Sequence, residues 1–323
     1  MARLRYYQRI VAAYLTRRKS QLTFWHDRPE VNEQALPGQL GQYYMPFLAK
    51  ADYPGDYDEQ GIPLLDYHGA VGKQYNPIAI AQYGLGNHNL YCRTGRQERR
   101  DKFLAVADWL AGNLEETPHG TRVWYHHFDW EYRDRLKAPW YSALAQGQGL
   151  SVLLRAHRET GRAGYLDAAE AAFHTFRRQI GEGGVVYTDT RGYVWFEEAI
   201  VDPPTHILNG FVWASWGVYD RMLHNGDPEA ARLFEQAVRT LRDNLPAFDA
   251  GFWSLYEQSG TRLKMLASPF YQRLHIAQLR VMHRLTGEPA FARFADRWEA
   301  YGRSRLKRTA ALAYKAAFKL FYY

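Results

Sequence analysis

A repeated pair of helices constrains the fold of this chain more than any other feature of its sequence. Three times, a long apolar segment with helical spacing ends at a glycine and is followed by an Ala-rich segment with the same spacing. The glycines are Gly161, Gly226 and Gly287, and each stands where a helix commonly ends. Such a repeat is typical of folds built from stacked helical hairpins. The sequence therefore predicts a mostly α protein.

A fourth hairpin precedes the other three. Segment 76–91 can begin a helix at Pro77, because proline is favoured at the first helical position, and segment 96–116 supplies its partner. Four hairpins of this kind can close into an inner and an outer ring of helices. We therefore expect an α/α barrel (toroid) in which short extended segments and the loops entering the inner helices line a cleft.

The same pattern predicts how the chain is divided. We expect residues 1–60 to form a basic amphipathic helix and a loop region, since prolines and glycines accumulate after residue 20. Residues 61–303 are expected to form the barrel. Residues 304–323 are expected to form a second basic amphipathic helix.

Composition and charge exclude several classes of protein. The net charge of +7 comes from the ends, because residues 1–20 and 303–323 each carry six cations and no acid, which leaves the body net negative. A nucleic-acid-binding scaffold is therefore not expected, and no nucleic-acid motif is present. The N-terminal apolar runs are far shorter than the roughly 20 residues of a membrane span. The single cysteine, Cys92, excludes an internal disulfide and suits the cytoplasm.

The two basic ends have two interpretations. Cations interspersed with apolar residues are typical of helices that lie on anionic lipid, which would place the protein peripherally on the inner face of a membrane. Alternatively, both helices pack against the barrel. The sequence does not specify an oligomeric state.

Acidic and aromatic side chains mark a candidate site. Glu197 and Glu198 stand a few residues before the helix predicted from residue 207, and Tyr256 and Tyr271 stand before the next inner helix. That placement puts all four at one mouth of the ring. A glutamate in such a cleft can have its pKa raised for proton transfer, whereas a pair on a solvated turn has no such role. Aromatic residues make up 15% of the chain, and in clefts they commonly stack on sugars or bases.

Five blocks of sequence resemble, in order, the signature blocks of the D-glucuronyl C5-epimerases, which act on heparosan and heparan sulfate precursors. They are NPIAIAQYGL (76–85), PWYSALAQGQGLSVLLRA (139–156), WFEEAIVDPPTHILNGF (195–211), SLYEQ (254–258) and FYQRLHIAQL (270–279). The resemblance covers roughly residues 60 to 303 and implies an α/α barrel. The animal enzymes insert a β domain between the AQYGL block and the ADWL helix, and this chain lacks that domain.

The resemblance implies an isomerase that converts D-glucuronate to L-iduronate in a heparosan-like polysaccharide or glycolipid of bacterial type. One group removes the proton alpha to the carboxylate, and another returns a proton to the opposite face of the ring. Matched block by block, the family's glutamate falls on Glu198 and two of its tyrosines on Tyr256 and Tyr271. No metal and no cofactor are expected. The expected substrate-binding residues are Tyr75, Asn76, Gln82, Tyr83, Trp140, Tyr141, Gln146, Gln148, Asn209, Arg273 and His275.

The sequence departs from the animal family at two positions. Ala199 stands where that family has a tyrosine, and Ser259 stands where it has an arginine, so Arg262 or Arg273 is a candidate for carboxylate recognition. Three other functions stay open. A uronate lyase would form the same carbanion and expel the C4 substituent, a glycoside hydrolase would use paired carboxylates, and a non-catalytic glycan-binding protein is favoured by Ala199.

One further cluster of polar residues lies in segment 124–135. His126, His127, Asp129 and Glu131 are metal-ligand types, but their spacing fits no zinc or iron pattern. The segment is better interpreted as an extended, aromatic wall of the cleft.

Overall fold

The computed structural model describes residues 24–131 and 135–322, so the helix expected over residues 1–20 lies outside the described residues. The chain divides into two compact units. The larger unit comprises Asn32–His206 and Gly210–Thr240, and the smaller unit comprises the remaining described residues. None of the described helices is long and apolar enough to cross a membrane.

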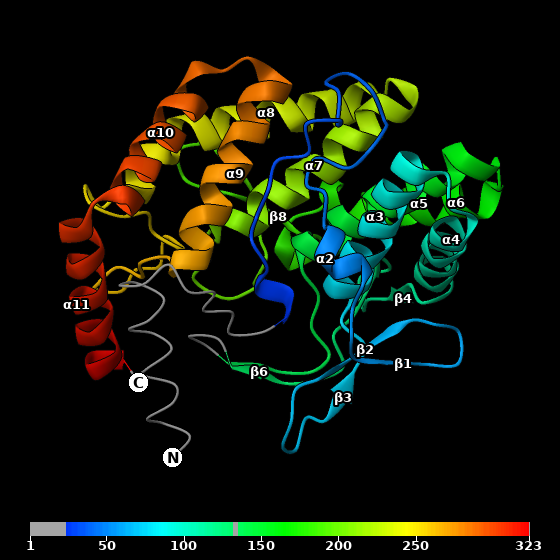
Figure 1. The fold of residues 1–323 in the computed structure, drawn as a ribbon, viewed down its shortest axis with the longest axis horizontal. Helices are drawn as coiled ribbons and strands as arrows, with labels where there is room; N and C mark the ends of the chain where they lie inside the picture. Colours follow the sequence, from blue (N-terminus) through cyan, green and yellow to red (C-terminus); the bar gives the residue numbers. More distant parts are fainter. Residues whose placement is uncertain (1–23, 132–134, 323) are drawn as a thin grey trace. The chain divides into compact units, whose positions relative to one another are not determined.

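The larger unit is built from helical hairpins (Figure 1). Its helices end at Gly95, Gly161 and Gly226, whose positive φ angles of 65 to 70° favour glycine. Three N-termini are capped by side chains. Asn76 accepts hydrogen bonds from Ile78 N and Ala79 N, Ser142 accepts one from Ala145 N, and Asp227 accepts from Glu229 N and Ala230 N. The hairpins are α3 (Pro77–Thr94) with α4 (Gln97–Gly112), α5 (Ala143–Thr160) with α6 (Ala163–Phe173), and α7 (Leu208–Asn225) with α8 (Pro228–Asn244). The first two residues of α7 and the last four of α8 belong to the smaller unit.

The first helices of these hairpins pack against one another. The amide of Gln82 on α3 donates to Gln148 on α5 over 3.1 Å. Helices α5 and α7 meet backbone to backbone, since a Cβ on Gly147 would lie 2.6 Å from the Cα of Ala214, and a Cβ on Gly217 would lie 2.3 Å from the carbonyl oxygen of Gly147. Small residues at this crossing therefore set the spacing of the helices that carry the candidate site.

All described strands belong to the larger unit and are short. They form antiparallel sheets of two or three strands in the connections between helices, as Figure 1 shows. Three short helices, α2 (Leu48–Ala51), η2 (His174–Arg177) and η3 (Ile180–Glu182), complete this unit. The sheets pair β1 (Asp56–Tyr57), β2 (Pro63–Asp66) and β3 (Lys73–Gln74); β4 (Glu115–Glu116) and β5 (Arg122–Val123); β6 (Trp130–Glu131) and β7 (Arg135–Leu136); and β8 (Val186–Thr188) and β9 (Val194–Phe196).

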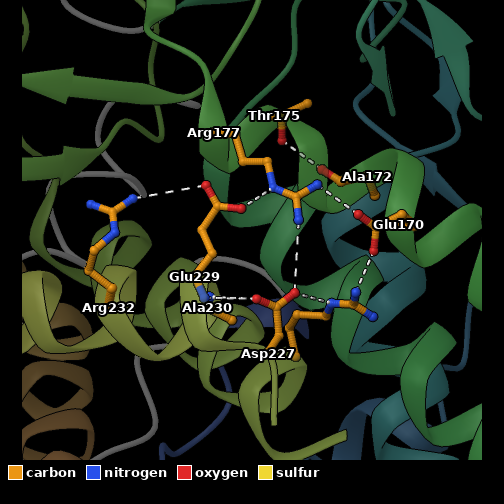
Figure 2. Close-up of polar contacts among 9 residues, drawn as sticks. Glu170, Ala172, Thr175, Arg177, Asp227, Glu229, Ala230 and Arg232 are labelled. Carbon is orange, nitrogen blue, oxygen red and sulfur yellow. Dashed lines mark hydrogen bonds and ion pairs between the residues drawn. The ribbon is translucent and has the colours of Figure 1, made fainter. Parts of the chain in front are cut away.

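A charged network joins the second hairpin to the third (Figure 2). Arg177 contacts Glu170 of α6 at 2.7 Å and Glu229 of α8 at 2.6 Å. Arg221 of α7 contacts Glu170 at 2.5 Å and Asp227 at 3.3 Å. Burial alone would raise the pKa of Asp227, but hydrogen bonds from the first turn of α8 and the charges of the two arginines hold that pKa below its ordinary value. The network therefore caps α8 and fastens it to α6.

A second ion pair lies in the core of the larger unit. The guanidinium of Arg155 on α5 holds the carboxylate of Asp220 on α7 through contacts of 2.5 and 3.1 Å, and both side chains are buried. The hydroxyl of Tyr44 donates to the same carboxylate over 2.5 Å. Both oxygens of the buried Asp220 carboxylate thus accept at least one hydrogen bond, as a buried ion pair requires.

The smaller unit contains the last hairpin and the C-terminal helix. Its elements are η1 (Phe24–His26), η4 (Leu245–Phe248), α9 (Pro269–Thr286), α10 (Pro289–Arg303) and α11 (Arg305–Tyr322). Helix α9 is capped by Ser268 and ends at Gly287, where φ is 71°. Helix α11 contacts segment 251–266, because Lys307 donates to Gly251 O over 3.3 Å, Lys315 donates to Leu266 O over 2.9 Å, and Tyr314 accepts from Lys264 N over 2.9 Å.

The predicted hairpins are confirmed, including the start of α3 at Pro77 and the ends of α5, α7 and α9 before Gly161, Gly226 and Gly287. One detail differs from the expectation. Tyr271 does not precede its helix but lies in the first turn of α9, because Ser268 rather than Tyr271 occupies the cap position.

Candidate active site

Glu198 lies against the first turn of α7. It follows β9 by two residues and is half-buried. A Cβ on Gly210 would lie 2.1 Å from Oε2 of Glu198 and 2.5 Å from its Cβ, so only glycine leaves room for this side chain. The N-terminal turn of a helix carries a positive partial charge, which favours the ionised carboxylate. Glu198 is thus held next to a helix terminus by the absence of a side chain on Gly210.

Glu197 has a different environment from its neighbour. Its side chain is only 1% exposed and contacts Nδ1 of His206 at 2.5 Å, while the backbone N–H of His206 donates to Oε2 over 3.2 Å. His206 has a positive φ of 52° and stacks on Trp195 at 4.2 Å between ring centroids. Both carboxylate oxygens of Glu197 therefore have partners, and this contact fixes the loop between β9 and α7.

The backbone of Glu197 also fixes the start of α5. Its N–H donates to Val185 O and its carbonyl accepts from Ala143 N, both over 2.9 Å. These bonds tie the segment that carries the two glutamates to Val185, which directly precedes strand β8, and to the first turn of α5. The position of Glu198 is therefore set by three surrounding elements, β8, α5 and α7.

The smaller unit brings the two candidate tyrosines together. The rings of Tyr256 and Tyr271 meet edge to face, with centroids 4.7 Å apart. Tyr256 lies in an irregular segment, and its carbonyl accepts a hydrogen bond from Leu208 N, at the start of α7, over 3.1 Å. The ring of His26 packs at 5.8 Å from that of Tyr271. The two phenols are thus neighbours within the smaller unit.

His275, one turn after Tyr271, is completely buried, and burial lowers its pKa to about 3. A relay of hydrogen bonds identifies its neutral tautomer. The amide of Gln272 donates to Trp298 O over 3.0 Å, so its oxygen faces Ser254 and accepts the hydroxyl proton over 2.6 Å. The Ser254 oxygen can then only accept from Nδ1 of His275, at 3.1 Å. His275 therefore carries its proton on Nδ1, and its Nε2 is an acceptor without a partner among the described residues.

The predicted substrate-binding glutamines are buried inside the larger unit. Both polar atoms of Gln146 are used by backbone groups, since Oε1 accepts from Trp124 N over 3.0 Å and Nε2 donates to Arg122 O over 3.2 Å. The side-chain oxygen of Gln82 accepts a hydrogen bond from the buried ammonium of Lys50, and its side-chain N–H donates to the oxygen of Gln148. The charge of Lys50 thus fixes the orientation of both amides, and Nε2 of Gln148 has no acceptor among the described residues.

Four of the predicted aromatic and amide residues flank the starts of α3 and α5. Tyr75 is exposed, and its hydroxyl donates to Asp58 over 2.7 Å; burial and Asp58 raise the pKa of Tyr75 to about 12. Asn76 caps α3. The ring of Trp140 stacks on that of His126 at 3.8 Å, and Tyr141 donates to Gly184 O over 3.3 Å.

The remaining predicted residues are divided between the units. Tyr83 is buried on α3, and its ring packs 5.8 Å from that of Tyr57. Asn209 is buried in the first turn of α7, and its carbonyl accepts from Gln278 of α9 over 2.9 Å. Arg273 is exposed on α9. Partial burial of its guanidinium and the charge of Arg28 lower the pKa of Arg273 below its ordinary value.

Sequence reasoning missed several residues that shape the site. Lys50, Gly210 and His206 act through partners that are distant in the sequence or depend on the backbone path, and no local signal marks them. Glu257 was also missed. It follows Tyr256 directly but is buried, and burial raises the pKa of its carboxyl group.

Comparison with known families identifies the family of this chain. The family described as the D-glucuronyl C5-epimerase C-terminus matches residues 119–300, more than half of the chain. The chain belongs to this family. Within it, the D-glucuronyl C5-epimerase of Caenorhabditis elegans is 31% identical over 221 residues, which are 64% of this chain and 36% of that protein.

Two further proteins are similar to this member of the epimerase family. An uncharacterized protein of Methanocaldococcus jannaschii is 29% identical over 199 residues, which are 60% of this chain and 63% of that protein. The chain thus spans less than two thirds of either sequence relative. The structure of cellobiose 2-epimerase from Spirochaeta thermophila aligns with a TM-score of 0.51 and 14% identity, covering 79% of this chain and 65% of that one. The expected fold class, mostly α and of the α/α-barrel type, is confirmed.

Proposed function

We propose that this protein is a C5-epimerase that converts D-glucuronate to L-iduronate residues within a uronate-containing polysaccharide or glycolipid. The observation that carries the proposal is the position of Glu198 against Gly210, in a chain that belongs to the glucuronyl C5-epimerase family. A carboxylate with little room to move, at a helix N-terminus, is suited to take a proton from a fixed position.

The reaction needs one base and one acid on opposite faces of the sugar. C5–H lies alpha to the carboxylate, so its removal by Glu198 leaves an enolate whose charge is shared by the carboxylate oxygens. A phenol, from Tyr256 or Tyr271, then delivers a proton to C5 from the other face. The enzyme is left with a protonated Glu198 and a tyrosinate, and exchange with solvent restores both groups.

The substrate carboxylate requires a cationic partner as it takes up enolate charge. Arg273, two residues after Tyr271, is the candidate on this chain, and Arg28 is a second. The charge of Arg28 acts on Arg273, and two like charges near each other favour the binding of an anion. We therefore assign carboxylate recognition to Arg273, with Arg28 as its partner.

The experiment is exchange at C5 in deuterated water with a heparosan polymer. The wild type should introduce deuterium at C5 and produce iduronate, both visible by NMR. Glu198→Gln, which is nearly isosteric, should lose exchange by a factor of about 10² to 10⁴. Glu197→Gln is the matched control, because Glu197 contacts His206 and should affect stability more than exchange.

Other outcomes would identify another function. Folded Glu198→Gln with undiminished exchange would remove Glu198 from the mechanism. An unsaturated, ultraviolet-absorbing product would indicate a lyase, and new reducing ends would indicate a glycoside hydrolase. Binding of the polymer without any exchange would indicate a glycan-binding protein, the alternative that Ala199 favours.

We also propose a peripheral contact with the cytoplasmic face of an anionic membrane through the basic ends. On α11, Lys307 and Lys315 donate to backbone carbonyls of segment 251–266, whereas Arg305, the first residue of the helix, is exposed. An exposed cation on an amphipathic helix supports attraction to anionic lipid. Intact protein that does not sediment with liposomes rich in anionic lipid at low salt would contradict this proposal.

A further inference from the structure

Trp130 is an exposed tryptophan on strand β6 of the larger unit. Its side chain has a relative exposure of 42%, whereas Trp124, Trp195, Trp216, Trp253 and Trp298 are fully buried. A single exposed apolar residue needs no explanation by itself. Trp130 is unusual because its surroundings hold it in place.

Aromatic neighbours fix the position of the Trp130 ring. Tyr67 of the connection after β2 meets it edge to face at 5.6 Å between ring centroids, and Phe128 does so at 6.4 Å. The rings of Tyr67 and Phe128 also pack against each other at 4.6 Å. The hydroxyl of Tyr67 accepts from the side chain of Asn76, which caps α3. An exposed ring supported in this way loses little conformational entropy when a ligand stacks on it.

Contacts within the same unit connect Trp130 to the candidate active site. The ring of Phe128 lies 6.1 Å from that of Trp140, whose indole N–H donates to Phe128 O over 2.8 Å. Trp140 and Tyr141 lead directly into α5, and the first residue of α5, Ala143, donates to Glu197 O over 2.9 Å. A chain of ring contacts and hydrogen bonds thus connects the segment that carries Glu198 to the exposed Trp130, through the buried ring of Phe128.

We propose that Trp130 is a stacking platform for a sugar ring of the glycan chain at a distance from the reacting uronate. Pyranose rings present flat C–H faces that pack on aromatic rings, and an indole offers the largest such surface among side chains. The uronate content of the glycan rests on the proposed function, whereas stacking requires only a sugar ring of any kind against the indole.

Calorimetric titration with heparosan oligosaccharides tests the platform. Trp130→Ala should raise the Kd of a decasaccharide about tenfold and leave the Kd of a disaccharide unchanged. Only the longer ligand can occupy the candidate active site and reach Trp130 at the same time. Trp130→Tyr should retain most of the affinity, since a phenol can still stack. Leu36→Ala is the matched control, because it removes another exposed apolar side chain that has no ring. Circular dichroism of each variant reports folding.

The indole N–H signals in ¹⁵N NMR spectra supply a readout that is independent of catalysis. The signal missing from Trp130→Phe identifies Trp130, and it should shift with the decasaccharide but not with the disaccharide. Unchanged affinity in Trp130→Ala together with C5 exchange by the wild type would overturn the platform and leave the epimerase intact. A Trp130 shift without any C5 exchange would support the platform and contradict the epimerase. No shift and no exchange would contradict both.

Discussion

The carboxylate of Glu198 occupies the space that a methyl group on Gly210 would fill, with Oε2 only 2.1 Å from the place of that absent Cβ. Gly210→Ala should therefore displace Glu198 while the helix itself gains about 1 kcal/mol from the better helix former. A displacement of about 1 Å can reduce turnover about a hundredfold. We expect C5 exchange to fall by about that factor. The new methyl group would also lie 2.5 Å from the Cβ of Glu198, so the unfolding midpoint should fall as well.

Gly164→Ala is the control for this prediction. Gly164 also lies in the first turn of a helix, α6, and a Cβ there would meet no atom within 4 Å. Its exchange rate should equal that of the wild type. Full exchange by Gly210→Ala would show that the position of Glu198 against α7 is unimportant.

The stability of the protein should fall steeply in acid. Burial, the first cause in each case, lowers the pKa values of His88, His126 and His275 to about 3. The unfolded chain binds protons at these histidines below pH 6.5, and the native chain does not, so stability is lost as the pH falls from 6.5 towards 3. Each histidine should contribute about 1.4 kcal/mol per pH unit within that window.

Urea unfolding between pH 7 and pH 4 measures this slope. His126→Phe keeps a flat ring against Trp140, which His126 stacks on at 3.8 Å, and removes one titrating group. The slope of the free energy of unfolding against pH should be smaller in this variant by the contribution of about one proton. An identical slope in this variant would mean that His126 takes up a proton in the native state.

Glu257 should titrate in the opposite sense. Burial raises the pKa of its carboxyl group, so the native chain keeps a proton that the unfolded chain releases above about pH 4.3. This group therefore destabilises the protein as the pH rises through that window. Glu257→Gln should melt at a higher temperature than the wild type at pH 7 and at the same temperature near pH 4. A lower melting temperature at pH 7 would show that the carboxylate is ionised and paired.

The buried pair of Arg155 and Asp220 should dominate the charge contribution to stability. Arg155→Met leaves the carboxylate of Asp220 buried with the Tyr44 hydroxyl as its remaining donor. We expect a loss of about 3 to 5 kcal/mol in the free energy of unfolding. Arg280→Met is the comparison, because Arg280 forms exposed pairs with Asp296 and Glu299 and should cost less than about 1 kcal/mol. Similar losses in both variants would contradict the argument.

Local signals in the sequence were sufficient to predict where the helices of the hairpins begin and end. Pro77 begins α3 and Gly161 and Gly287 follow the ends of α5 and α9, because proline and glycine act on the backbone where they stand. The short strands gave no such signal, since two to four residues carry no measurable alternation. The position of Tyr271 inside α9 depended on which residue capped the helix.

The candidate site was predicted less completely than the fold. The resemblance to the epimerase family pointed to Glu198, and the structure adds Gly210, which no pattern of residue types marks. Gln146 matched the family, but its amide is used to hold the backbone around Trp124, a role that depends on contacts 22 residues apart. Lys50 orients Gln82 across 32 residues. Such pairings arise from the path of the chain, and composition does not reveal them.

The three contacts of α11 with segment 251–266 have a genetic consequence. A premature stop codon just before Arg305 would leave every hairpin encoded but remove Lys307, Tyr314 and Lys315, which hold the segment containing Tyr256. The expected product is a folded protein whose Tyr256 segment is cut quickly by proteases and whose exchange activity is low. Nonsense alleles at this position should therefore behave as loss-of-function alleles even when the shortened protein accumulates.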